Sequence, residues 1–393
     1  MGIFSSAKNK NELVLVFDVG SSSVSGALFL TQESGIPKII FSVVEPIKLE
    51  EKLDVNRFLP LMLQALEAVV NKIYFAKLGA PDRCFCVLSS PWYTSQTRII
   101  SYKKNTPFIF NTKLADELIQ KEIKVFEEEN LEKYKNIGNA VRAIELKNIK
   151  TSLNGYEVSK PLNQKTKELE MVIFVALSGE QVLQGIENIV SKHFNFHQIK
   201  FSSFTMASFS AVRDMNHQKI DFLLADIAGE ITDISMIKNN VLRESISFPI
   251  GRNFFIRGVA SLLGCSLDEA KSLISLFKDE HAEKSIVERI MPVMDKLKTE
   301  WLKKFQESLA HLSHDISVPA TIFIAIDKDL ASFFNQTIKT EQFSQYSLTE
   351  SKFEVIFLST ELLHGFASFE DKVIRDPFLI MDSVYISRFL KSK

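Results

Sequence analysis

A pattern that occurs twice constrains this chain more than any other feature. It consists of an apolar run that ends in or near an aspartate, a turn of small residues, and a second apolar run. The first copy reads Leu13 to Asp18, a turn, and Val24 to Leu30; the second reads Phe222 to Ile227, a turn, and Asp233 to Lys238. Apolar runs joined in this way predict β-hairpins. Two similar hairpins far apart in one chain predict two similar halves that face each other across a cleft.

The chemistry of the two turns points to phosphate and magnesium. Backbone N–H groups and hydroxyls in a tight turn bind phosphate, and carboxylates belong to a magnesium shell. Asp18 stands at the end of the first strand and Asp226 at the end of the second. The alternative interpretation is that these are two unrelated structural hairpins, because strand–Asp–turn sequences also occur in ordinary β structure.

Length and composition fit a globular protein of two or three units. The chain has 393 residues, of which 46% are hydrophobic and 24% charged, and a domain takes roughly 150 residues. Lys and Arg number 47 against 48 Asp and Glu, a net charge of -1, which is not the electrostatic footprint of a nucleic-acid-binding protein. The 14 glycines form no Gly-x-Gly, so the Rossmann fingerprint and the Walker P-loop are excluded.

The remaining signals concern the compartment. No window has the roughly 18 consecutive apolar residues of a membrane-spanning helix, and the polar start of the chain is unlike a secretory signal. Three cysteines, Cys84, Cys86 and Cys265, are typical of a reducing compartment, with the first two as core thiols.

The pattern of elements predicts four segments. From 91 to 192, strand-like pieces alternate around one charged helix, Lys113 to Lys135, which indicates an inserted α+β unit. We therefore expect 12–83 to be the first part of lobe 1, 84–192 the inserted domain with its return to the main body, 193–338 lobe 2 with a helical subdomain at about 252–316, and 339–393 the closing part of lobe 1.

These pieces together resemble the actin-like superfamily and, within it, the bacterial cell-division family FtsA, with the pilus-assembly family PilM as a relative. The resemblance covers nearly the whole chain. The segments that carry it are Asp18-Val19-Gly20-Ser21, Asp226-Ile227-Ala228-Gly229, Cys86 to Ser90 with Gln96 to Ile100, Leu153 to Val158, Phe248 to Asn253, Leu263 to Ala270, and Asp376-Pro377-Phe378.

The resemblance implies an α/β fold of the actin-like (ribonuclease-H-like) type, with two lobes and an inserted α+β (SHS2-type) domain. It also implies ATP and Mg²⁺ as cofactors, with Asp18 and Asp226 ordering the metal through water. The residues expected at the nucleotide are Asp18, Gly20, Ser21, Ser22, Ser23, Asp226, Gly229, Thr232, Asp233, Gly251, Ile326 and Asp327. No catalytic residue is assigned.

Several departures from the family pattern indicate a degraded ATP site with weak or absent ATPase activity. The second turn has Ala228 and Glu230 where the family has glycine, and a carboxylate repels a polyphosphate unless a cation lies between them. The strand end at Ile326, where the family has glycines that approach the purine, is β-branched. Lys271 and Ile274 stand where the family has Glu and Lys.

The resemblance implies a scaffold in a bacterial envelope machine, at the inner face of the cell membrane. The main interpretation is an FtsA-like protein that links an FtsZ-like division polymer, a tubulin homologue, to the inner-membrane machinery. The alternative is a PilM-like scaffold whose partners are pilus inner-membrane proteins, and a second alternative is a sugar-kinase-type phosphotransferase. Self-association stays open. Because the chain ends directly after its closing helix, membrane contact is expected to be indirect.

Overall fold

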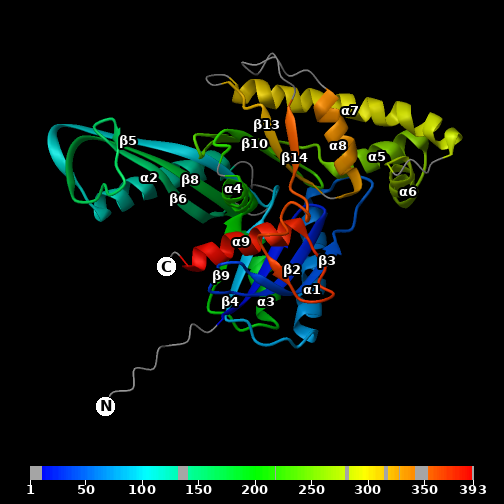
Figure 1. The fold of residues 1–393 in the computed structure, drawn as a ribbon, viewed down its shortest axis with the longest axis horizontal. Coiled ribbons are helices and arrows are strands. Elements are labelled where there is room, and N and C mark those ends of the chain that lie inside the picture. The colour runs from blue at the N-terminus through cyan, green and yellow to red at the C-terminus, as the bar shows by residue number, and fades with distance from the viewer. Residues whose placement is uncertain are drawn as a thin grey trace.

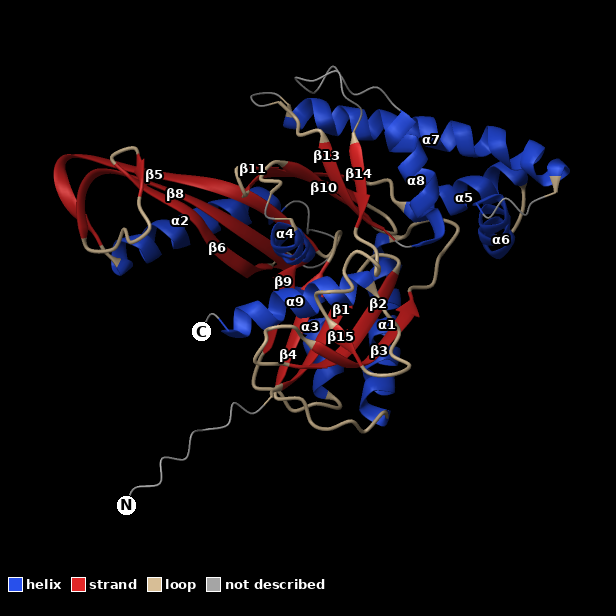
Figure 2. Ribbon diagram, viewed as in Figure 1, coloured by secondary structure: helices blue, strands red, loops and turns tan. Residues whose placement is uncertain are grey.

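The computed structural model describes residues 11–131, 140–216, 218–278, 283–313, 317–326, 328–340 and 353–391. This part of the chain forms two lobes, each built on its own β-sheet, and a third, elongated sheet that projects to one side (Figures 1 and 2). In the view of Figure 1, lobe 1 lies below, lobe 2 above, and the projecting sheet to the left.

Lobe 1 has a six-stranded sheet in the order β15-β3-β2-β1-β4-β9. Its centre is β1 (Leu13–Val19), which pairs antiparallel with β2 (Ser23–Leu30) and parallel with β4 (Arg83–Leu88). The other strands are β3 (Lys38–Pro46), β9 (Ile199–Ser203) and β15 (Ser368–Phe369), and the helices are α1 (Val55–Phe75), α3 (Glu180–Ser191), α4 (Phe204–Met215) and α9 (Pro377–Lys391).

Lobe 2 repeats this topology in a five-stranded sheet of order β12-β11-β10-β13-β14. Its central β10 (Phe222–Ile227) pairs antiparallel with β11 (Thr232–Lys238) and parallel with β13 (Thr321–Ile326). The other elements are β12 (Val241–Phe248), β14 (Glu354–Phe357), α5 (Arg252–Leu263), α6 (Leu267–Lys278), α7 (Lys284–Leu312) and α8 (Lys328–Thr340). The two sheets therefore share one strand order, 3-2-1-4-5, around equivalent hairpins.

The insert is a four-stranded sheet of order β5-β8-β6-β7 with one helix against a face. Its elements are β5 (Tyr93–Phe110), α2 (Thr112–Asn130), β6 (Val141–Leu153), β7 (Tyr156–Glu157) and β8 (Gln164–Gly179). Ile123 and Phe126 of α2 are buried against Ile100, Met171 and Val175 of the sheet. The α2 helix begins one residue before the predicted start, and residues 132–139 lie outside the described part of the chain.

Helix α1 shows how sequence pattern produces this packing. Asp54 caps its N-terminus by accepting a hydrogen bond from the N–H of Asn56. Met62, Leu66 and Val69, spaced at helical period, are fully buried in the core of lobe 1. By length and composition alone this helix could also cross a membrane, but the buried stripe identifies it as a core helix.

Sheet pairing assigns three segments differently from the sequence expectation. β4 pairs with β1, so 84–88 belong to lobe 1 and the insert begins at β5. β9 pairs with β4 and also belongs to lobe 1, although it falls within 193–338. β14 pairs with β13 of lobe 2, although it falls within 339–393. The reason is the same each time, because strands adjacent in a parallel sheet are distant in sequence.

Candidate functional site

Asp18 and Asp226 occupy equivalent places at the junction of the lobes. Asp18 lies opposite Ser25 in the first hairpin, and Asp226 lies opposite Asp233 in the second. Both aspartates are buried, with 5% and 7% of their surface exposed. Alongside burial, which has the larger effect, the negative charges of both aspartates act on a third carboxyl group, that of Asp382 on α9, and raise its pKa. The structure thus brings the two aspartates into one acidic cluster.

Asp382 was not predicted from the sequence. It is completely buried, and neither of its carboxyl oxygens has a hydrogen-bond partner among the described residues. Burial, followed by the charges of Asp18, Asp376 and Asp226, raises the pKa of Asp382 well above its ordinary value. The available signal was an acid inside the apolar stretch that forms the buried face of the closing helix.

A metal site made by side chains alone is not evident in this cluster. In the described ranges, no group of three or more His, Cys, Asp or Glu side chains is placed to hold a metal ion. The expected magnesium role of Asp18 and Asp226 would therefore depend on oxygens from water and from a bound phosphate.

The two turns expected to bind phosphate touch each other. A Cβ atom added to Gly229 would lie 2.6 Å from the carbonyl oxygen of Ser21 and 2.7 Å from the nitrogen of Ser22. The N–H of Glu230 donates a hydrogen bond of 3.0 Å to Oγ of Ser21. Ser21 and Gly229, which were both expected at the nucleotide, are in direct contact with each other.

The carboxylate of Glu230 has its counter-cation inside the protein. Arg257 of α5 donates to it through both terminal nitrogens, at 2.8 Å and 2.6 Å, and Asn253 donates at 2.7 Å. The Nε–H of Arg257 donates to the carbonyl oxygen of Glu50 in lobe 1. Sequence reasoning identified Glu230 as a departure but missed Arg257, which lies one helical turn after Asn253 on the same face of α5.

Backbone contacts also hold the turns in place. The N–H of Gly20 donates to the carbonyl oxygen of Ser23, which closes the first turn, and the carbonyl oxygen of Ser22 accepts from the backbone of the segment after β3. The indole N–H of Trp92 donates to the carbonyl oxygen of Gly20 at 2.6 Å. Gly251 lies against the second turn, where a Cβ would be 2.4 Å from the carbonyl oxygen of Ala228.

Two residues expected at the nucleotide make hydrogen bonds within the protein. The hydroxyl of Thr232 donates to the carbonyl oxygen of Ile250 and accepts from the indole of Trp301. Asp233, the next residue, accepts hydrogen bonds from Ser90 and Ser247, and burial raises its pKa. The hydroxyl of Thr232 is therefore engaged within lobe 2, and the side chains of Thr232 and Asp233 point to opposite faces of β11.

The region expected to receive adenosine contains a hollow of about 330 Å³ between α5, α6 and α8. Lys271 and Ile274 both line it. Ile326 is buried at the end of β13, beside Ile227, and is not among the lining residues. Asp327 lies outside the described residues. The remaining lining residues are Arg252, Ile256, Ser272, Ser275 and Leu330.

This geometry does not fit a polyphosphate. A phosphate group between the hairpins needs a gap of several ångströms between the two turns, and here the backbone of Gly229 rests on that of Ser21. The carboxylate of Glu230 also already engages Arg257, the cation beside this point. The fold has room near the expected nucleoside position but not between the expected phosphate turns.

A larger hollow, of about 820 Å³, lies where both lobes meet the insert. Aromatic and apolar side chains line it, including Phe58, Trp92 and Phe126, together with polar groups such as Thr205 and Asp233. The hydroxyl of Tyr93 at its wall is 2.6 Å from that of Thr205. A cavity of this size with mixed lining fits a ligand or a segment of a partner chain.

Two lobes of one strand order, joined at paired hairpin turns, define the actin-like ATPase fold, and this chain has it. It is similar to the solved PilM-PilN type IV pilus biogenesis complex, with a TM-score of 0.58 and 14% identity over 96% of this chain and 98% of that chain.

Weaker likenesses include the ethanolamine utilization protein EutJ from Carboxydothermus hydrogenoformans (TM-score 0.45, 12% identity, 97% of this chain and 90% of that chain). A protein of unknown function with an actin-like ATPase fold from Bacteroides thetaiotaomicron is also similar (TM-score 0.44, 9% identity, 98% of this chain and 99% of that chain). Neither a family model nor a curated protein matches the sequence. At these identities the likeness shows the fold.

Proposed function

We propose that this chain is a PilM-like scaffold of type IV pilus assembly, acting at the cytoplasmic face of the inner membrane. The observation that carries the proposal is the likeness to PilM, which extends over 96% of this chain and 98% of the other and so includes the insert as well as both lobes. This favours the pilus alternative over the division interpretation, which rests on the sequence resemblance to FtsA.

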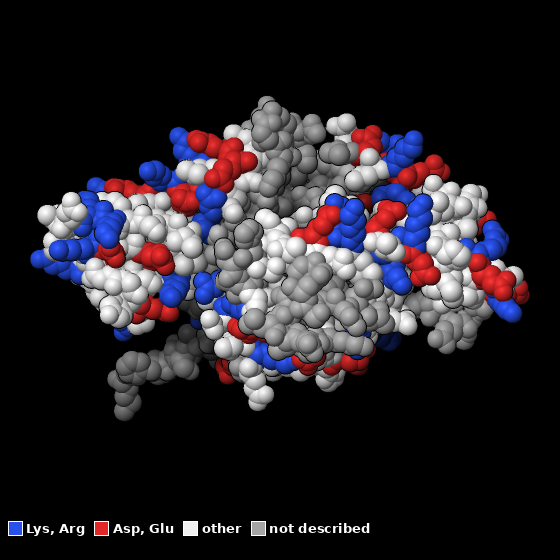
Figure 3. Space-filling model, turned by 90° about the horizontal axis from the view of Figure 1, so that it is seen from above, with Lys and Arg blue, Asp and Glu red and all other residues white. Residues whose placement is uncertain are grey.

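A scaffold of this kind acts by binding rather than by chemistry. The direct contact between the turns gives no support to the phosphotransferase alternative, which needs a well-formed nucleotide site. Both signs of charge are interspersed over the face seen in Figure 3, so a partner is expected to be recognised by shape and local contacts rather than by a field of one sign.

The partner fits best in the 820 Å³ hollow. Its walls come from lobe 1, lobe 2 and the insert, so a segment bound there touches all three parts. Aromatic side chains beside hydroxyl groups along these walls favour an extended peptide, whose side chains enter apolar pockets while its backbone finds polar partners. We propose a segment of a PilN-type protein, the partner present in the similar solved complex, as the occupant.

The test is a calorimetric titration of the full chain with overlapping synthetic peptides that together cover the PilN-type protein encoded in the same genome. Saturable binding is expected, and Ser95→Trp, which fills part of the hollow, should weaken it at least tenfold. The matched control is Ser101→Trp, on the same face of the same strand but outside the hollow. No binding by the unmodified chain, or equal loss with both variants, would contradict the proposal.

A further inference from the structure

We propose that Glu230 is a built-in anion that takes the phosphate position of the cleft and clasps the two lobes together without nucleotide. This inference goes beyond the scaffold function and does not depend on the partner. It starts from the disagreement between the actin-like ATPase fold, whose cleft is expected to hold a polyphosphate, and a cleft that this chain fills with its own groups.

The groups around Glu230 are those that bind phosphate in proteins. An arginine fork donates to both carboxylate oxygens, and the amide of Asn253 donates to one of them, with all three distances between 2.6 Å and 2.8 Å. Bidentate pairing with arginine is the geometry that carboxylate and phosphate share. The pair is enclosed, since the side chains of Glu230 and Arg257 are 7% and 18% exposed.

The clasp links the two lobes through both partners of the ion pair. Glu230 belongs to the second turn, in lobe 2, and its N–H donates to Ser21 of the first turn, in lobe 1. Arg257 belongs to α5 of lobe 2, and its Nε–H donates to the carbonyl oxygen of Glu50 in lobe 1. Each end of the ion pair therefore has one hydrogen bond across the cleft.

The clasp also excludes an external anion. Glu230 is attached to the turn it holds, so its effective concentration at Arg257 is high and a free polyphosphate competes at a disadvantage. Entry of a phosphate group would also require the backbones of Gly229 and Ser21 to separate, because they are in contact. The carboxylate and the close packing thus work in the same direction.

The experiment measures the melting temperature of the full chain with and without pyrophosphate, and with and without Mg-ADP. The unmodified chain should show no shift with either probe. In Glu230→Ala the Arg257 fork loses its anion, so the melting temperature should fall, and pyrophosphate at ten times its Kd should raise it again by about 2–4 °C. Glu67→Ala is the matched control, since Glu67 forms an exposed ion pair with Lys192; it should not respond to pyrophosphate.

Two further variants keep the test decisive. Glu230→Ala combined with Arg257→Met should lose the response, because the cation that would bind the probe is gone. If Glu230→Ala does not fold, Glu230→Gln retains the shape and removes the charge, and it should respond to pyrophosphate while the unmodified chain does not. A shift of the unmodified chain by pyrophosphate or Mg-ADP as large as that of Glu230→Ala would overturn the proposal, as would a folded Glu230→Ala or Glu230→Gln that does not respond to pyrophosphate.

Discussion

Replacing Tyr385 with Phe tests how the insert is fixed to the main body. Glu145 on β6 of the insert is buried, with 7% of its surface exposed. It accepts hydrogen bonds from the N–H and Oγ of Ser203, at 2.9 Å and 2.7 Å, and from the hydroxyl of Tyr385 on α9. One carboxyl group therefore joins the insert to a strand of lobe 1 and to the closing helix.

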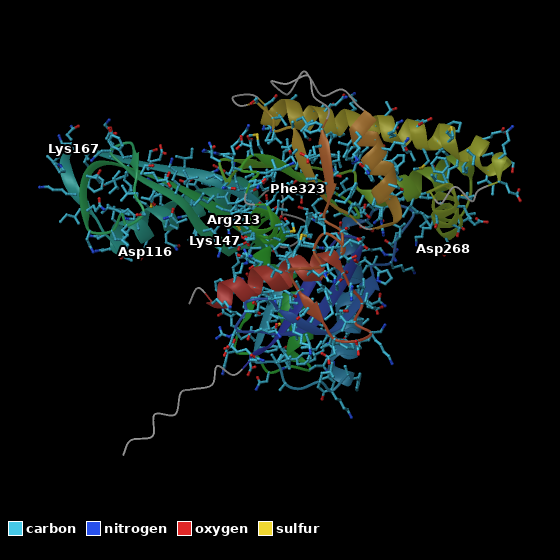
Figure 4. The ribbon with its side chains drawn as sticks, in the orientation of Figure 1. Asp116, Lys147, Lys167, Arg213, Asp268 and Phe323 are labelled. Carbon is cyan, nitrogen blue, oxygen red and sulfur yellow. The ribbon has the colours of Figure 1, made fainter. Side chains whose placement is uncertain are left out.

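The aromatic ring of Tyr385 has further neighbours that the variant would keep. The ammonium of Lys147, also on β6, lies 5.6 Å from the centre of that ring and 5.3 Å from the ring of Phe389. Figure 4 labels Lys147 on the insert. Because Tyr385→Phe keeps the ring and removes only the hydroxyl, the change isolates the hydrogen bond.

Where Glu145 is ionised, the expected cost is about 1.5–3 kcal/mol, the contribution of a hydrogen bond to a charged group. The cost should depend on pH. Burial raises the pKa of Glu145 above its ordinary value of 4.5, while the hydrogen bonds from Tyr385 and Ser203 oppose that rise. Without the hydroxyl the folded-state pKa rises further, so ionisation of Glu145 costs more stability in the variant.

The direction of this pH dependence follows from the linkage between protonation and folding. Because the folded pKa of Glu145 lies above the unfolded one, the stability associated with its neutral form is fully present below pH 4.5 and is lost as the pH rises through the folded pKa. The variant has a higher folded pKa for Glu145, so it loses stability over a wider range of pH than the unmodified chain does. The destabilisation by Tyr385→Phe should therefore be largest at neutral pH and smaller near pH 4.5.

Urea denaturation at pH 4.5 and pH 7.5, followed by circular dichroism, measures both quantities. Tyr156→Phe is the control, since Tyr156 is 78% exposed on the insert, and it should change stability by less than about 0.5 kcal/mol at either pH. A cost for Tyr385→Phe below that level, or one that is the same at both pH values, would refute the role given to Glu145.

Three further predictions concern the cleft. Gly251→Ala should lower the free energy of unfolding by about 1–3 kcal/mol in urea denaturation, because the added Cβ would lie 2.4 Å from a carbonyl oxygen. Gly365→Ala is the control, since its Cβ meets open space and the change should be nearly neutral. Equal effects of the two variants would contradict this prediction. Asp382→Asn should become more stable than the unmodified chain as the pH rises above 3.8, because only the unmodified chain must then ionise a buried carboxyl group or keep it protonated. The difference in the free energy of unfolding should grow by about 1.4 kcal/mol per pH unit up to the raised folded pKa. A difference that does not change between pH 5 and 7 would contradict this prediction. Trp92→Phe should cost about 1 kcal/mol through the lost hydrogen bond to Gly20, measured in the same way, and an unchanged midpoint would show that the bond contributes nothing.

Pairs of strands that are adjacent in the sequence could be predicted, whereas pairs that are distant in the sequence could not. Each hairpin could be predicted, since its strands are adjacent in sequence and its turn is marked by small residues. The membership of β4, β9 and β14 could not, because a parallel strand finds its neighbour through a long connection that leaves no local mark. The boundaries of the insert and of lobe 2 were misplaced for that reason.

The site was predictable in part. Ser21 and Gly229 were expected at one cleft, and the structure brings them together. Thr232 was expected at phosphate but points into lobe 2. Arg257 and Asp382 were not expected at all, since neither belongs to a recognisable motif. A motif gives residue types and spacing, whereas the direction of a side chain depends on the packing around it.

The sequence by itself determined the duplicated hairpins and placed the carboxylate of Glu230 in the second turn, because periodicity, turn composition and charge are properties of neighbouring residues; the two-lobed actin-like fold was expected from the family resemblance. Only the tertiary structure decided what that carboxylate does. In isolation a carboxylate in a phosphate turn is a repulsive charge, but Arg257 and Asn253, placed beside it by α5, make it one half of an ion pair between the lobes. The energy of a charge depends on what surrounds it in space, and folding alone sets those surroundings.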